Sequence, residues 1–165
     1  MNKRLLVAVL LLLPLATATG TRAHAFSSAL DPSECDSIDS VPMRFDIDYG
    51  ADVQPIFTEH CANCHVDSGG APLAGLELDV GVSWFQLVGT PSSQDPSLTR
   101  VIPGDAAQSL LFQKVNCYFP TIGSRMPFER PELSVEDQAV IHDWIVLGAS
   151  STTSEVIFLS GFEVR

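Results

Sequence analysis

Two cysteines separated by two residues and followed at once by a histidine constrain this chain more than any other feature. They are Cys61, Cys64 and His65. On a helix the two thiols lie about one turn apart, so both can reach vinyl groups on one edge of a porphyrin ring. The histidine that follows can ligate the iron from one side of that ring. The motif therefore predicts covalent attachment of haem c through Cys61 and Cys64, with His65 as the first axial ligand.

The first 25 residues have the pattern of a secretory signal peptide. Lys3 and Arg4 precede an unbroken apolar run over 5–13. This run ends before Pro14 and is shorter than the roughly 20 residues that a membrane span needs. Cleavage is expected after Ala25, within an Ala-His-Ala sequence. The sequence thus predicts an exported protein, periplasmic or secreted, with no transmembrane segment in the mature chain.

The charge of the chain restricts its partners. Removal of the three basic residues in the signal peptide changes the net charge from −11 to −14. Such an acidic protein is poorly suited to bind nucleic acid or an anionic membrane. The charge favours basic docking surfaces on the expected redox protein partners, but solubility alone accounts for most of it. About 140 residues remain after cleavage, which is enough for one compact domain and a tail.

Cys35 and Cys117 remain once the motif has taken the other two cysteines. In an oxidising compartment a pair of left-over cysteines usually forms a disulfide. We therefore expect a bond between Cys35 and Cys117 that ties the N-terminal arm to the domain.

A short helix is predicted to lead into the motif. Residues 26–48 are rich in Ser, Asp and Pro and show little periodicity, as is typical of an arm or linker. The pattern changes from Tyr49, and Val53, Ile56 and Phe57 follow helical spacing toward Cys61. Asp52 can cap this helix, and Pro55 is tolerated in its first turn.

Three further segments show helical patterns. The first covers 79–88, where the density of Val and aromatic residues also allows a strand. The second covers 106–115 after a possible cap at Asp105. The third and clearest covers 135–147 after Ser134, which begins a sequence similar to a capping box.

A second axial ligand must come from elsewhere in the chain. His60 precedes the motif on the same helix and cannot reach the opposite face of a haem. His142 lies within the last predicted helix, and Met43 lies in the arm. Met126 lies in the irregular loop 116–131, so it can turn inward, although most methionines simply pack in a core. Met126 is therefore the predicted second ligand.

Several pieces of sequence resemble a known family. Residues 51–149 resemble a class I c-type cytochrome domain, and their middle part resembles a bacterial branch of cytochrome c-like domains. The matching pieces are Leu87-Val88-Gly89, Arg100-Val101, Pro103-Gly104-Asp105, Lys114, Arg125-Met126-Pro127, Trp144-Ile145 and Gly148-Ala149. The resemblance implies haem c on Cys61 and Cys64, with iron ligation by His65 and Met126. Two features depart from the pattern: three residues separate His65 from the first glycine, and Cys117 has no counterpart.

The resemblance also implies a fold and a domain organisation. The expected fold is all-α, a small cytochrome c-like helical domain wrapped around haem. The expected organisation is a signal peptide over 1–25, an arm or linker over 26–48, a haem domain over 49–149 and a tail over 150–165. The apolar segment 156–159 and the Gly-Phe-Glu that follows resemble the ending of some exported bacterial proteins.

Side chains and carbonyls around the haem can be predicted less directly. A backbone carbonyl near Pro72 can accept a hydrogen bond from the His65 ring and fix its orientation. Arg100, Lys114 or Arg125 can pair with a haem propionate. Each of these three residues is also consistent with an ordinary surface charge.

The function expected from these features is electron transfer through one haem c, in a protein that is not itself an enzyme. A haem peroxidase or a haem c subunit of a dehydrogenase complex is the main alternative. A peroxidase needs an open iron position, which a His and Met ligand pair does not leave. A thiol oxidoreductase usually has a strand before its two cysteines, and a zinc module needs a second close ligand pair. Neither is found in the sequence.

Overall fold

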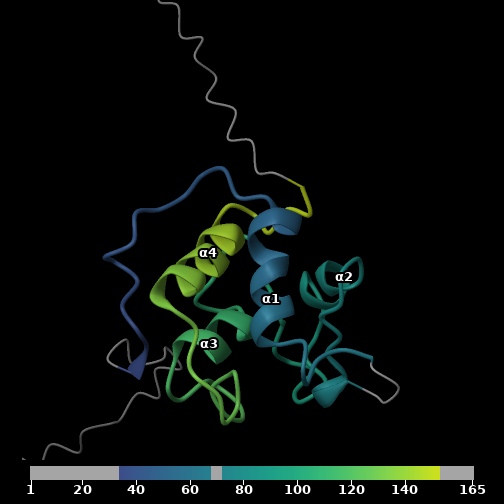
Figure 1. Ribbon diagram of the computed structural model, residues 1–165. Coiled ribbons are helices and arrows are strands. Elements are labelled where there is room, and N and C mark those ends of the chain that lie inside the picture. The colour runs from purple at the N-terminus through teal and green to yellow at the C-terminus, as the bar shows by residue number, and fades with distance from the viewer. Residues whose placement is uncertain (1–33, 68–71, 153–165) are drawn as a thin grey trace, which may run out of the picture.

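The computed structural model describes residues 34–67 and 72–152 (Figure 1). The predicted signal peptide over 1–25 and the apolar tail segment 156–159 lie outside these residues. The helices of the described part are α1 (Gln54–His60), α2 (Ser83–Leu87), α3 (Leu110–Asn116) and α4 (Val135–Val146). A π-helical turn, η2 (Tyr49–Val53), leads directly into α1, and a 3₁₀ turn, η3 (Leu73–Gly75), follows the cysteine motif.

The helices pack around a small aromatic centre. Figure 1 shows α1 between α4 and α2, and α4 packs against both α3 and η2. Trp144 of α4 and Phe57 of α1 are fully buried. The ring of Tyr49 lies 5.1 Å from that of Trp144 and 6.4 Å from that of Phe57, measured between ring centroids. The last helix therefore closes onto the first, directly before the cysteine motif.

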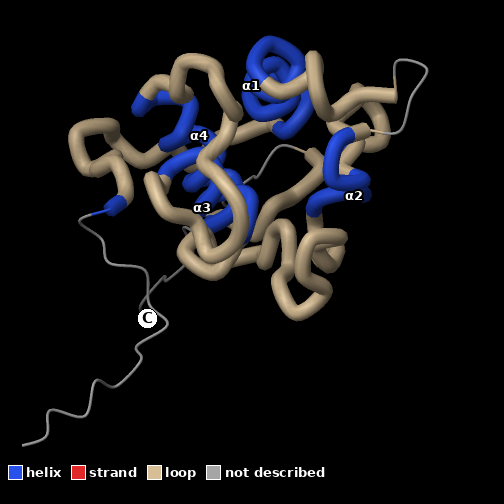
Figure 2. Tube along the Cα trace, turned by 90° about the horizontal axis from the view of Figure 1, so that it is seen from below, coloured by secondary structure: helices blue, strands red, loops and turns tan. Residues whose placement is uncertain are grey.

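The prediction of an all-α, cytochrome c-like domain wrapped around haem is wrong in its fold class. Only about 35% of the confidently placed chain is helical, and those residues form no sheet. Helices α1, α2 and α3 have five to seven residues each. Figure 2 shows loops and turns along most of the path between the helices. The resemblance of the motifs to class I c-type cytochromes stays a prediction.

Local turn chemistry explains why two predicted helices are shorter than expected. The helix expected over 106–115 begins only at Leu110, because Asp105 stabilises a separate turn in which its Oδ1 accepts a hydrogen bond from the Gln108 backbone at 3.0 Å. The helix expected over 79–88 begins only at Ser83, after Gly81 with a φ of +88°. A glycine in this left-handed conformation interrupts the helical path before α2.

The sequence correctly predicted the N-terminal cap of α4 but not the cap of the first helical turn, η2. Ser134 caps α4 as predicted, with its hydroxyl accepting a hydrogen bond from the Asp137 backbone at 3.0 Å. The first helical turn begins earlier than predicted, because Asp48 rather than Asp52 is the cap and accepts from the Ala51 backbone at 2.9 Å.

The described part of the arm, residues 34–48, runs from the end of α3 around the outside of α4 to the start of η2 (Figure 1). The predicted disulfide between Cys35 and Cys117 is present. The Arg44 backbone donates to Asp143 of α4 at 2.8 Å, and Ile47 is fully buried in the core. The arm is thus fixed to the body at both ends. None of the helices in the described ranges is long and apolar enough to cross a membrane.

Candidate functional site

The cysteine motif follows α1 in a tight turn. The Cys61 backbone donates to the Phe57 carbonyl at 2.9 Å and so completes the last turn of the helix. The Cys64 and His65 backbones both donate to the Cys61 carbonyl at 3.1 Å. These bonds fold the motif back on itself, so that its cysteines and histidine face a common space. The prediction that a short helix delivers the motif is confirmed.

The orientation of the His65 ring is fixed from one side. Its Nδ1 lies 3.0 Å from the Leu73 carbonyl and 3.2 Å from the Leu76 carbonyl. A carbonyl can only accept, so Nδ1 carries the proton and Nε2 is left with its lone pair. Burial lowers the pKa of His65, which favours this neutral form. A neutral imidazole with one nitrogen held by a carbonyl is the usual state of a histidine that ligates a metal. The predicted acceptor near Pro72 is therefore the carbonyl of the next residue.

All four residues expected to hold haem line one cavity. Cys61, Cys64 and His65 form one part of its wall, and Met126 forms another. The cavity has a volume of about 330 Å³, within the range of roughly 300–1,000 Å³ for small-molecule and cofactor sites. The Met126 backbone donates to the Lys114 carbonyl at 2.6 Å, which holds the methionine loop against α3.

Much of the rest of the wall is apolar, and it contains two buried cations. Leu78, Leu87 and Leu111 line the cavity and are buried or nearly so. Arg100 and Lys114 also line it and are 7% and 8% exposed. Burial lowers the pKa of both side chains. An apolar cavity with buried positive charge suits a flat apolar ligand that carries anionic groups.

The hydrogen bonds of these two cations lead mainly to carbonyl groups. Arg100 donates to the Gln86 carbonyl at 2.8 Å and to the Gly75 carbonyl at 3.0 Å. Lys114 Nζ donates to the Ser124 carbonyl at 3.3 Å. Neither forms an ion pair with an acidic side chain of the described residues. Their charge is therefore available to an anionic ligand in the cavity.

The third predicted propionate partner has a different role. The Arg125 side chain pairs with Asp36 and Glu132, and it is not part of the cavity wall. Arg125 thus connects the arm to the body through its ion pairs. Of the three predicted propionate partners, Arg100 and Lys114 are the two that line the cavity.

The other histidines and methionine of the described residues fall in three different places. His60 lines the cavity, and its Nε2 lies 3.8 Å from Asp137. His142 contacts Asp143 of its own helix at 2.9 Å and is not part of the cavity wall. Met43 is an exposed residue of the arm. Met126 is the methionine that the structure brings to the same cavity as His65.

Three polar side chains of the wall were missed by the sequence analysis: Ser92, Gln94 and Arg130. Ser92 and Gln94 come from the loop after α2, which Pro91 and Thr99 close with an antiparallel bridge. No motif or periodicity marks these residues, because they reach the cavity only through the path of the loop.

The two motif cysteines are free thiols. Burial, with a smaller contribution from Cys64, raises the pKa of Cys61 to about 12. A thiol with such a pKa is a poor nucleophile at neutral pH, so Cys61 itself is poorly suited to attack a disulfide. Within 34–67 and 72–152, no three His, Cys, Asp or Glu side chains form a group that could hold a metal ion.

A second hollow of about 640 Å³ lies on the surface between η2, α1 and α2. Tyr49, Gln54 and Trp84 line it, and none of the predicted site residues does. The candidate site is therefore the smaller cavity, which the predicted haem-binding residues line.

No protein-family model, curated protein or solved structure matches the chain.

Proposed function

We propose that this protein carries one haem c, bound covalently through Cys61 and Cys64, and transfers electrons between redox proteins. The observation that supports this most strongly is that Cys61, Cys64, His65 and Met126 line a single apolar cavity. The chain brings these residues together across 61 positions of sequence between His65 and Met126. The free state of both thiols also agrees with attachment through them.

Each group of the cavity has a role in this proposal. His65 offers Nε2 to the iron while the Leu73 carbonyl holds its other nitrogen. Met126 offers its thioether sulfur as the second ligand. When bound, haem supplies a reversible one-electron change at its iron, and a thioether ligand favours the reduced form and raises the reduction potential. The leucines of the wall keep water from the ring, and Arg100 and Lys114 balance its propionates.

A function in electron transfer is favoured over catalysis at the iron. A histidine and a methionine would occupy both axial positions and leave none for oxygen or peroxide. A porphyrin would bring its own nitrogen ligands, so two protein ligands would be sufficient. We propose that redox proteins with basic docking surfaces are its partners, because the chain is strongly acidic.

We also propose that the protein works outside the cytoplasm, in the periplasm or as a secreted protein. The Cys35–Cys117 disulfide is of a kind that persists in oxidising compartments. The signal peptide pattern over 1–25 points in the same direction.

Haem staining of a denaturing gel tests the attachment. The full chain, produced in a host that matures c-type haem proteins, should keep its stain after denaturation. The variant Cys61→Ala/Cys64→Ala should lose it, whereas the matched control Cys35→Ala/Cys117→Ala should keep it. A colourless wild-type protein would refute the proposal.

The visible spectrum tests the ligand. A ferric haem with a methionine ligand has a weak long-wavelength absorption that other ligands do not give. Met126→Ala should abolish this band, and the control Met43→Ala should leave it unchanged, since Met43 lies in the arm. Persistence of the band in Met126→Ala would show that another residue is the ligand.

A further inference from the structure

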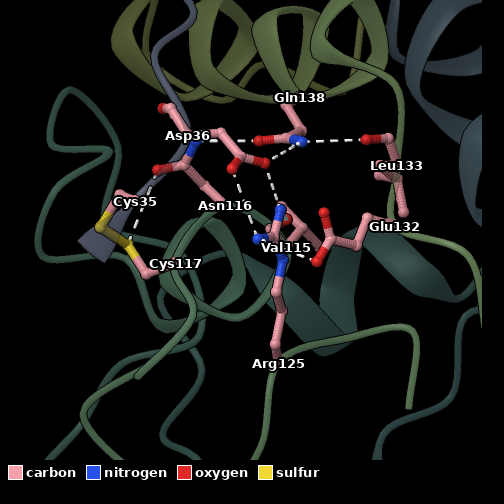
Figure 3. A network of polar contacts seen from close by, with 9 residues as sticks. All are labelled: Cys35, Asp36, Val115, Asn116, Cys117, Arg125, Glu132, Leu133 and Gln138. Carbon is pink, nitrogen blue, oxygen red and sulfur yellow. Dashed lines mark hydrogen bonds and ion pairs between the residues drawn. A yellow bond between two sulfur atoms is a disulfide. The ribbon is translucent and has the colours of Figure 1, made fainter. Parts of the chain in front are cut away.

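A partly buried polar network joins the arm to the loop that carries Met126 (Figure 3). Its centre is the carboxylate of Asp36, which pairs with the Arg125 guanidinium through both of its oxygens. The Gln138 side chain of α4 donates to the same carboxylate at 2.9 Å. Asp36 and Arg125 are 89 positions apart in sequence, so this contact depends on the folded arm.

Asp36 is the principal counter-charge of Arg125. The Arg125 side chain is only 11% exposed, and its Nε atom has no hydrogen-bond partner among the described residues. Its second ion-pair partner, Glu132, lies 3.3 Å away with a side chain that is 53% exposed, so solvent weakens that interaction. Loss of the Asp36 charge would leave a nearly buried cation without its closest partner, which is strongly unfavourable.

Asp36 is itself held in place on its backbone side. Its N–H donates to the Asn116 carbonyl at 3.0 Å, and the Asn116 side chain donates back to the Asp36 carbonyl at 2.9 Å. The preceding residue, Cys35, is bonded to Cys117 directly after α3. The carboxylate is therefore fixed relative to the end of α3.

The methionine loop is attached to α3 at two consecutive residues. Arg125 donates to the Val115 carbonyl at 3.3 Å, and the Met126 backbone donates to the Lys114 carbonyl at 2.6 Å. Lys114 and Val115 themselves line the cavity. If Arg125 moved away from α3, the adjacent Met126 would lose the anchor that keeps it at the cavity wall.

We propose that Asp36 is a positioning residue that, through Arg125, holds Met126 at the cavity as the second iron ligand. This inference rests on the proposed function for its ligand role. Asp36 is not part of the cavity wall and touches neither haem nor iron. Its effect passes through the ion pair and the two anchors of the loop on α3.

Displacement of the methionine by added imidazole tests the proposal on the ferric holoprotein. Asp36→Asn removes the charge with little change of shape and should strengthen imidazole binding by roughly tenfold or more, since a charge-assisted hydrogen bond is lost. The matched control is Asp52→Asn, because Asp52 pairs with Arg44 of the arm at 3.0 Å and has no contact with the methionine loop. The control should change imidazole binding by less than about twofold.

Hydrogen exchange of the Met126 amide gives a second readout that does not need haem ligation. Asp36→Asn should speed exchange of this amide by roughly tenfold, while Asp52→Asn should not. Equal effects of the two variants, or no effect of Asp36→Asn on either measurement, would overturn the proposal. A wild-type protein without haem would refute the proposed function, and the amide measurement would still decide whether Asp36 positions Met126.

A milder variant covers the case in which Asp36→Asn does not fold. Asp36→Glu keeps the charge but moves it by one methylene group, so it should shift both measurements in the same direction by about threefold. Asp36→Glu with wild-type values in both measurements would contradict a role that depends on the position of this carboxylate.

Discussion

Removal of the disulfide between Cys35 and Cys117 should destabilise the protein by an amount that follows from its loop length. The two cysteines are 82 residues apart. The chain-entropy relation for a closed loop of this size gives about 4.5 kcal/mol at 25 °C, and native disulfides of small secreted domains typically contribute about 2–5 kcal/mol. Because domains of this size have a total stability of about 5–15 kcal/mol, we expect Cys35→Ala/Cys117→Ala to lose about 2–4 kcal/mol, a large share of the total.

Urea unfolding followed by circular dichroism measures this loss. The oxidised wild type is compared with the double variant and with the wild type reduced by an excess of thiol, which does not cleave the thioether bonds of a haem c. The double variant and the reduced wild type should show a similar decrease in the free energy of unfolding, because both lack the disulfide. A loss below about 1 kcal/mol in both would refute the loop-entropy reasoning. A loss in the variant alone would assign the effect to packing around Cys117, which is 3% exposed.

Two further predictions concern the same region of the molecule. The hydrogen bond from Arg125, opposed by burial and aided by Gln138, lowers the pKa of Asp36 below its ordinary value of 3.8. The ionised Asp36 therefore stabilises the fold above that value, and this contribution is lost as the pH falls through the lower pKa of the folded state. Urea unfolding of Asp36→Asn between pH 7 and pH 3 should accordingly show a smaller decline than the wild type, and equal declines would contradict the assignment. Gly123→Ala should lower the free energy of unfolding by about 1–2 kcal/mol, because Gly123 has a φ of +67° and a Cβ there would lie 2.7 Å from Lys114 Nζ; an unchanged urea midpoint would refute this.

The features that the sequence predicted correctly depend on residues that are close together in the chain. The helix before Cys61 and the carbonyl acceptor next to Pro72 both involve residues close to His65 in sequence. Ser134 was recognised as a cap because its partner is three residues away. Short-range chemistry of this kind can be read from the order of residues alone.

The fold class was mispredicted because turn-forming residues compete with helix-forming patterns. The apolar spacing over 106–115 is helical, but Asp105 begins a turn that delays α3 until Leu110. The role of Asp36 could not be predicted at all, because its partner Arg125 is 89 positions away and the surrounding sequence has the composition of a linker. Contacts at such distances leave no periodicity that a single sequence could show.

The two sides of the proposed iron site are therefore supported in different ways. The His65 side depends on α1 and on carbonyls that follow the motif closely, so it should form wherever residues 49–76 fold correctly. The Met126 side depends on α3 and on a charge supplied by the arm. A disturbance of the arm should consequently weaken the methionine side first and leave covalent attachment intact. A thioether ligand raises the reduction potential of a haem. In the proposed site, Asp36 and the disulfide beside it would therefore let the arm influence that potential without contacting the haem.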